Sequence, residues 1–151
     1  MKDTNMHAIK DHYRFGVLFD GSAIAERALR KTMTMRADHD NLTVITVIEQ
    51  GINEQTIRQK IDTICGTAAH DIVILHPEPN HTIKMTVKNY LLAQAEDDRY
   101  VDFISVGGRG VNAAEATGGP EDFLGSVARA MISMRKLNVI FVPWAQNLNY
   151  W

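Results

Sequence analysis

Five short apolar runs, separated by amphipathic stretches, most constrain what this chain can fold into. The runs contain many Val, Ile and Leu residues, are bounded by Gly, Pro or Asp, and occupy residues 14–20, 42–48, 71–76, 101–106 and 138–142. Runs of this length and composition predict buried strands. Between them, apolar residues recur at the helical period over residues 23–36, 53–65, 82–97 and 123–136. The chain is therefore predicted to alternate strand and helix throughout.

This alternation predicts an α/β fold with a parallel sheet and helices on both of its faces. Right-handed crossovers limit the topology to a few doubly wound arrangements. We expect one domain over residues 14–143, preceded by a loose leader over residues 1–13 and followed by a tail over residues 144–151. In doubly wound sheets, ligands bind beyond the carboxyl ends of the strands, where the strand order reverses.

A glycine-rich turn follows the fourth run at this position. Gly107, Gly108 and Gly110 surround Arg109, and a predicted helix begins after a loop. Glycine lets backbone N–H groups approach a ligand closely. A helix start adds unpaired N–H donors and a positive dipole end. This combination predicts an anion site, most often for phosphate, although a tight turn alone would explain the glycines.

Composition excludes several classes of protein. The 151 residues are 45% hydrophobic and carry a net charge of −2, without a basic block, so no nucleic-acid partner is predicted. No apolar run approaches the ~20 residues of a membrane span, and the N-terminus lacks the apolar core of a signal peptide. The single cysteine, Cys65, cannot form an internal disulfide. We therefore expect a cytoplasmic protein without a membrane anchor.

Other motifs in the sequence give weaker support for a dinucleotide or a metal ion as the ligand, and no support for a P-loop nucleotide. Gly108, Gly110 and Ala113 fit the dinucleotide fingerprint, but they follow the fourth strand and not the first. No P-loop is present. His76 and His81 could bind a metal with Glu78, but a proline-rich turn is the simpler explanation.

The role of the aspartate after the first strand also stays open. Asp20 could be a general base or could cap the first helix. No serine or histidine partner stands at a motif spacing from it. A hydrolytic enzyme therefore has the least support.

Several segments together resemble the universal stress protein family: FGVLFDGS, LTVITVIE, ISVGGRG and FLGSVARAMI, followed by NVIFV. The resemblance covers residues 14–143. It implies a five-stranded parallel sheet in the order 3-2-1-4-5, a homodimer, a role in the stress response and, in many members, binding of ATP. The family motif is G-x2-G-x9-G-(S/T), with an aspartate after the first strand.

Carried over to this chain, the resemblance implies a nucleotide site. Asp20 would meet the adenine or ribose edge, and Val47 would offer its backbone to adenine. The phosphates and ribose would contact backbone groups and donors of Gly107, Gly110, Gly125, Ser126 and Val127. Arg109 could hold a phosphate. The ligand expected is ATP or a related adenine nucleotide, with Mg²⁺ as an option, acting as a switch with little or no hydrolysis.

The spacing of the motif departs from the family. Fourteen residues separate Gly110 from Gly125 instead of nine, and the insert carries Glu115, Glu121 and Asp122 but no Lys or Arg. The tail adds Trp144, Leu148, Tyr150 and Trp151. These features keep a second interpretation open, a homodimeric interaction module of the same fold without a nucleotide. In either case we expect the dimer to form through the fifth strand.

Overall fold

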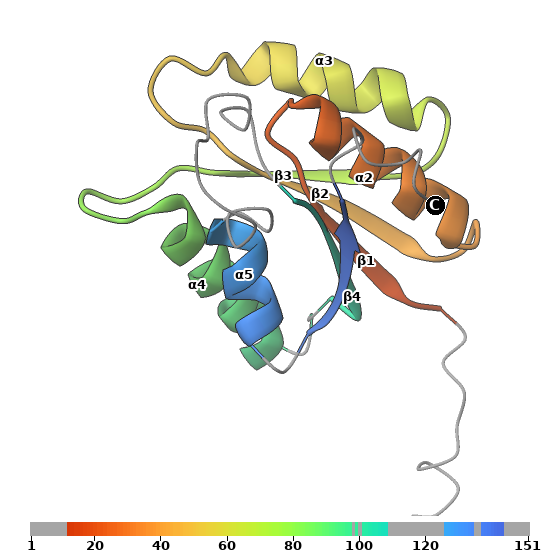
Figure 1. Cartoon of the computed structure of the whole chain (residues 1–151). Helices are drawn as coiled ribbons and strands as arrows, with labels where there is room; N and C mark the ends of the chain where they lie inside the picture. Colours follow the sequence, from red (N-terminus) through yellow and green to blue (C-terminus); the bar gives the residue numbers. More distant parts are fainter. Residues whose placement is uncertain (1–11, 98, 100, 109–125, 135–136, 144–151) are drawn as a thin grey trace, which may run out of the picture.

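The structure is a computed structural model that describes residues 12–97, 99, 101–108, 126–134 and 137–143. Five strands and four helices alternate within these residues (Figure 1). The strands are β1 (Arg14–Leu18), β2 (Asn41–Val47), β3 (Asp71–Leu75), β4 (Phe103–Gly107) and β5 (Asn138–Val142). The helices are α2 (Ala23–Met35), α3 (Glu54–Cys65), α4 (Ile83–Glu96) and α5 (Ser126–Ser133).

The strands form one parallel sheet in the order β3-β2-β1-β4-β5. Gly16 in the central strand β1 pairs with Thr43 on one side and with Ile104 on the other. The predicted α/β fold and strand order are therefore confirmed. The edges of the sheet are β3 and β5.

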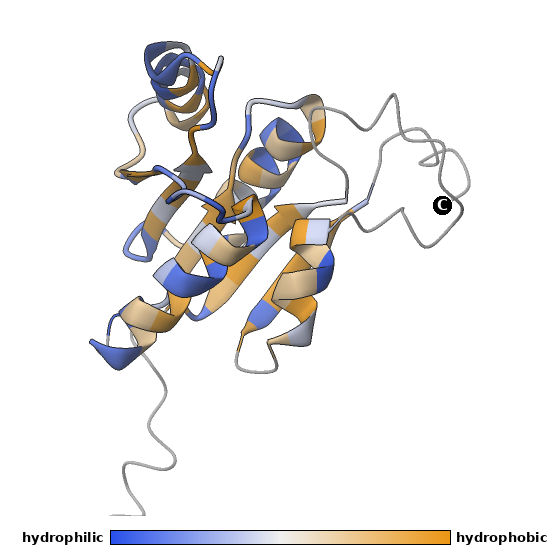
Figure 2. Ribbon diagram, turned by 90° about the vertical axis from the view of Figure 1, so that its left-hand side faces the viewer, coloured by the Kyte–Doolittle hydropathy of each residue, from blue (hydrophilic) through white to orange (hydrophobic). Residues whose placement is uncertain are grey.

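Each face of the sheet has its own apolar core, because side chains alternate along every strand. The face covered by α2 and α3 holds Phe15, Val17, Leu42, Val44, Leu29 and Ile61. The face covered by α4 and α5 holds Ile45, Ile104, Val87, Leu91 and Met131. Figure 2 shows hydrophobic residues on the strands and on the helix surfaces that face them. The sheet is thus buried on both sides, as expected for parallel strands.

One buried polar contact joins a helix to the sheet. The hydroxyl groups of Thr32 in α2 and Ser105 in β4 lie 2.6 Å apart, and Thr32 Oγ1 also lies 2.8 Å from the Ala28 carbonyl. Both side chains are fully buried. Because they bond each other, neither hydroxyl remains without a partner in the core.

The helix boundaries follow capping residues. Ser22, Asn53 and Thr82 are the N-caps of α2, α3 and α4, each accepting a backbone N–H with its side chain. Gly66, with φ +58°, ends α3. In α4, Val87 and Leu91 are buried, but Ala95, one turn further along the same stripe, is exposed.

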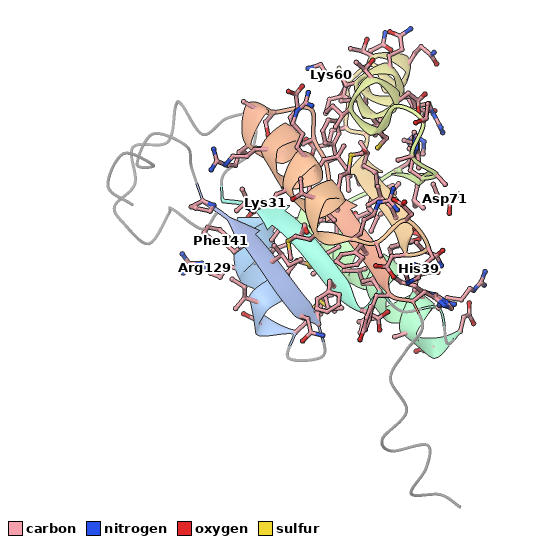
Figure 3. The ribbon with its side chains drawn as sticks, turned by 90° about the vertical axis from the view of Figure 1, so that its right-hand side faces the viewer. Lys31, His39, Lys60, Asp71, Arg129 and Phe141 are labelled. Carbon is pink, nitrogen blue, oxygen red and sulfur yellow. The ribbon has the colours of Figure 1, made fainter. Side chains whose placement is uncertain are left out.

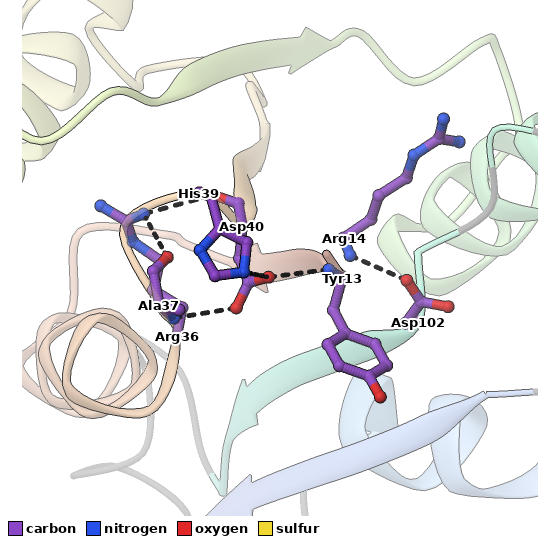
Figure 4. Close-up of polar contacts among 7 residues, drawn as sticks. All are labelled: Tyr13, Arg14, Arg36, Ala37, His39, Asp40 and Asp102. Atoms are coloured by element: carbon purple, nitrogen blue, oxygen red, sulfur yellow. Dashed lines mark hydrogen bonds and ion pairs between the residues drawn. The ribbon is translucent and has the colours of Figure 1, made fainter. Parts of the chain in front are cut away.

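The amino edge of the sheet is held by two aspartates (Figure 4). Asp40 accepts hydrogen bonds from the N–H groups of Tyr13 and Ala37, both at 2.8 Å. Asp102 accepts the Arg14 N–H at 2.8 Å. Burial is the largest single effect on the Asp40 carboxyl and opposes its ionisation, but the two N–H donors together with the nearby His39 and His12 outweigh it and lower its pKa below the ordinary value. These contacts occupy the amino edge and leave the carboxyl edge for a site.

Candidate functional site

The carboxyl edge of the sheet between β1 and β4 is the candidate site. The helix after β1 packs on one face of the sheet, and the helix after β4 packs on the other, so the winding reverses between these two strands. Figure 1 shows that α2 and α5 both begin at this edge. A doubly wound sheet places its ligand at such a reversal.

The turn after β1 is built around Asp20. Its Oδ1 accepts the Ser22 N–H at 2.9 Å and the Ser22 hydroxyl at 2.5 Å. The Ser22 Oγ in turn accepts the Ala25 N–H at 3.2 Å. Ser22 is therefore the cap of α2, and Asp20 fixes the cap instead of being the cap itself. The Asp20 carboxylate at the carboxyl edge therefore has a local structural role, which is to hold the cap of α2.

Helix α3 supports the same turn from the side. Gly21 has φ +84°, a conformation that favours glycine, and a Cβ there would lie 2.8 Å from Ile57 Cδ1. Lys60 Nζ donates to the Gly21 carbonyl at 3.2 Å. The exposed Lys60 thus brings a positive charge to this turn, which the sequence alone did not indicate because Lys60 and Gly21 lie far apart in the chain.

The backbone of Val47 faces β1 at the end of β2. Phe19 N–H donates to the Ile45 carbonyl at 2.9 Å, whereas Ile48 N–H donates to Leu75 on the opposite edge at 2.8 Å. Since backbone groups alternate along a strand, the N–H and C=O of Val47 point to the β1 side. A parallel ladder would next join Val47 N–H to the Phe19 carbonyl, but no such bond forms in the described part of the chain. A donor and an acceptor therefore stand side by side at this edge.

Gly107, the first glycine of the predicted motif, ends β4 and packs against α2. A Cβ on Gly107 would lie 2.9 Å from Ile24 Cγ1, 3.1 Å from Cγ2 and 3.3 Å from the Ile24 carbonyl carbon. Close approach of α2 to β4 therefore requires a glycine here, whether or not a ligand binds. This packing role was missed because the sequence does not show which helix crosses β4.

Only part of the predicted phosphate-binding segment can be described. Ser126 is the first described residue of α5 and is exposed. The side chain of Val127 packs against the core on the α4 and α5 face, which leaves only its amide for a ligand. Arg109, Gly110 and Gly125 lie outside the described residues.

The described groups offer binding chemistry more clearly than catalytic chemistry. Asp20 bonds Ser22, which is the cap of α2. In the predicted alternative metal site, His81 Nδ1 lies 3.8 Å from Glu78 Oε2. Over the described ranges of the chain, no group of three or more His, Cys, Asp or Glu side chains could hold a metal ion. Likewise, no described helix has the length and apolar character needed to cross a membrane.

The sequence analysis did not identify one buried polar group near the edge, the hydroxyl of Thr46. Thr46, beside Val47, is 1% exposed, and its hydroxyl has no hydrogen-bond partner among the described residues. It lies on the α2 and α3 face of the sheet, because it alternates with Ile45 and Val47. A threonine in an apolar strand is not distinguishable in sequence from an ordinary β-branched core residue.

The fold defines the class of protein. A parallel sheet in the order 3-2-1-4-5, with a winding reversal between β1 and β4, is a doubly wound α/β domain. No protein-family model matches the sequence, and no curated protein is significantly similar to it. Solved structures do share its architecture.

The structural neighbours are universal stress proteins or have the same fold. A universal stress protein in complex with cAMP superposes with a TM-score of 0.59 at 20% identity, over 86% of this chain and 95% of that one. A universal stress protein from Archaeoglobus fulgidus superposes with a TM-score of 0.54 at 16% identity, over 86% of this chain and 93% of that one. Protein Rv1636 from Mycobacterium tuberculosis H37Rv superposes with a TM-score of 0.55 at 18% identity, over 91% of this chain and 99% of that one. The chain therefore has the universal stress protein fold, which confirms the resemblance inferred from sequence at the level of architecture.

Proposed function

We propose that this chain is a universal stress-type protein that binds an adenine nucleotide at the carboxyl edge between β1 and β4. ATP is the ligand expected from the motif, and the solved neighbour with cAMP supports an adenine nucleotide in this fold. The protein would work in the cytoplasm as part of a stress response. A divalent ion such as Mg²⁺ would accompany a triphosphate.

The observation that carries the proposal is the backbone of Val47. Its N–H and C=O face β1 beyond the last bond of the ladder. Adenine presents an acceptor at N1 next to a donor at N6, so one residue can satisfy both atoms through its main chain. This would make Val47 a reader of the base that does not depend on its side chain.

The phosphates would lie toward the start of α5. Ser126 and Val127 are the first described residues of this helix, and their N–H groups would lie at a helix start, which favours negative charge. Arg109, Gly110 and Gly125 would complete the phosphate site from the glycine segment, and Asp20 would meet the ribose. Gly107 would allow the main chain to approach the ligand while it packs on Ile24.

Binding would act as a switch. At this edge Asp20 holds the cap of α2 through Ser22, and the protein would hold the nucleotide with little or no hydrolysis. The ligand would select one arrangement of the segment between β4 and α5. A homodimer formed through β5, an edge strand of half-buried residues, would present this segment to a partner.

A second candidate is a homodimeric interaction module without a nucleotide. It is favoured by the fact that Gly107 and Asp20 both have roles in packing and capping that need no ligand. The acidic insert also works against binding of phosphates. The two candidates differ in whether purified protein carries or takes up adenine nucleotide.

Calorimetry with ATP and with inosine triphosphate tests the proposal on the unmodified chain. Hypoxanthine has a donor at N1 and an acceptor at O6, which reverses the pattern presented to Val47. We expect inosine triphosphate to bind at least about tenfold more weakly, because two buried polar contacts become unfavourable. Equal affinities would exclude Val47 as the reader of the base, and binding of neither would favour the second candidate.

A matched pair of serine variants tests the phosphate end. Ser126→Ala removes a hydroxyl at the first residue of α5, whereas Ser133→Ala removes one at the last residue, where it bonds the Arg129 carbonyl. Ser126→Ala should weaken ATP binding about three- to tenfold through one lost hydrogen bond, and Ser133→Ala should leave it unchanged. An equal effect of both variants would show that the loss comes from the helix and not from a contact with phosphate.

A further inference from the structure

The connection between α3 and β3, residues 66–70, is held by the two ring nitrogens of His70. The Nδ1 atom lies 2.7 Å from the Ala68 carbonyl, and Nε2 lies 2.8 Å from Asp62 Oδ1. The His70 side chain is 14% exposed, whereas that of Asp62 is 63% exposed. The ring therefore links its own connection to the last turns of α3.

Both partners of the ring are hydrogen-bond acceptors. A carbonyl and an ionised carboxylate have no proton to donate, so each ring nitrogen must carry one for both contacts to be hydrogen bonds. Only the imidazolium form satisfies this condition. In the neutral form, one nitrogen would direct its lone pair at an acceptor, and the contact with Asp62 or with Ala68 would be lost.

The surroundings of the ring favour its charged form. Burial by itself lowers the pKa of His70, but the Ala68 carbonyl and the carboxylates of Asp62 in α3 and Asp71 in β3 outweigh it. The net result is a pKa above the ordinary value of 6.5. Figure 3 shows Asp71 on the side of the molecule where β3 and α3 lie.

We propose that His70 is a proton-controlled clasp that closes the α3–β3 connection when the ring is charged and releases it when the ring is neutral. The direction of the pH dependence follows from the raised pKa of His70. The stabilisation is complete below about 6.5 and is lost as the pH rises through the higher pKa of the folded state. The clasp thus opens as the pH rises above 6.5, and it lies at the amino edge of the sheet, away from the proposed nucleotide.

Two backbone amides in the connection report whether the clasp is closed. Gly66 N–H donates to the Asp62 carbonyl at 2.8 Å, and Ala68 N–H donates to the Cys65 carbonyl at 3.1 Å. NMR of the full-length protein between pH 5.5 and 8.5 can follow the His70 ring and the hydrogen-exchange protection of these two amides together. His70→Gln assigns the ring signal.

We expect the ring to titrate above 6.5 and the two protection factors to fall about three- to tenfold over the same pH range, through the loss of one hydrogen bond. Asp62→Asn keeps an acceptor but removes the charge, so it should move both midpoints to lower pH. The control is His39→Gln, at a histidine side chain that is 67% exposed. It should change neither the midpoint of the His70 ring nor the midpoint of amide protection. A ring midpoint at or below 6.5, protection that does not vary with pH, or midpoints unmoved by Asp62→Asn would each overturn the proposal.

Discussion

Replacing Gly107 by alanine tests how closely α2 and β4 are packed. The added Cβ would meet Ile24 at 2.9, 3.1 and 3.3 Å, and the last of these distances is to a main-chain carbon. Rotation of the Ile24 side chain cannot remove such a contact, and Ile24 is 2% exposed, so the first turn of α2 must shift. We expect a loss of about 1–3 kcal/mol in the free energy of unfolding, the usual cost of overpacking a core.

A double-mutant cycle isolates the cause. Ile24→Ala removes both γ-carbons and should cost about 2–5 kcal/mol through the cavity it leaves. In that background, Gly107→Ala should cost at least about 1 kcal/mol less than in the unmodified protein, because its two shortest contacts are gone. Urea denaturation followed by far-ultraviolet circular dichroism gives all four free energies.

Two results would refute the packing argument. One is a Gly107→Ala variant as stable as the unmodified protein, and the other is strict additivity in the cycle. If the expected result is found, weaker nucleotide binding by Gly107→Ala would report the displaced α2 and not a lost ligand contact. The serine pair in α5 is therefore the better probe of the phosphate site.

Two further variants test buried polar groups. Thr46→Val should raise the free energy of unfolding by about 1 kcal/mol. It replaces a buried hydroxyl, which has no partner in the described chain, by a methyl group of similar size. A clear decrease in the free energy of unfolding would mean that the hydroxyl is hydrogen-bonded. Asp40→Asn should cost about 1.5–3 kcal/mol at pH 7, because an amide cannot accept both N–H groups of Tyr13 and Ala37. Since the pKa of Asp40 is lowered in the folded state, its contribution is present above about 3.8 and is lost as the pH falls below that value. Acid titrations of stability should therefore be shallower in Asp40→Asn, and parallel curves would contradict the assignment.

The sheet could be predicted from the sequence because its signals are local. Residues 138–142 form β5 as expected, and the order 3-2-1-4-5 follows the resemblance. Capping is likewise a local signal: Thr82 caps the start of α4 and Gly66 ends α3. The exposure of Ala95 was not predictable from periodicity, because spacing marks the apolar stripe of a helix but not how far along the helix the packing extends.

Contacts between distant elements could not be predicted in this way. Thr32 belongs to the apolar stripe of α2, and Ser105 lies within an apolar run, yet their hydroxyl groups bond each other. The approach of Ile24 to Gly107 and of Lys60 to Gly21 likewise depends on how helices cross strands. The sequence identifies which residues carry polar or small side chains, but tertiary packing decides what they contact.

This distinction matters for the site itself. Gly107 and Asp20 fit the nucleotide motif, but each also has a contact that the fold needs, with Ile24 and with Ser22. A protein of this fold that had lost its ligand would still retain both. Among the described residues, the N–H of Val47 forms no ladder bond to Phe19, so it has no such second role. The glycine and the aspartate alone therefore do not distinguish a chain that binds a nucleotide from one that does not, and Val47 is the better position to test.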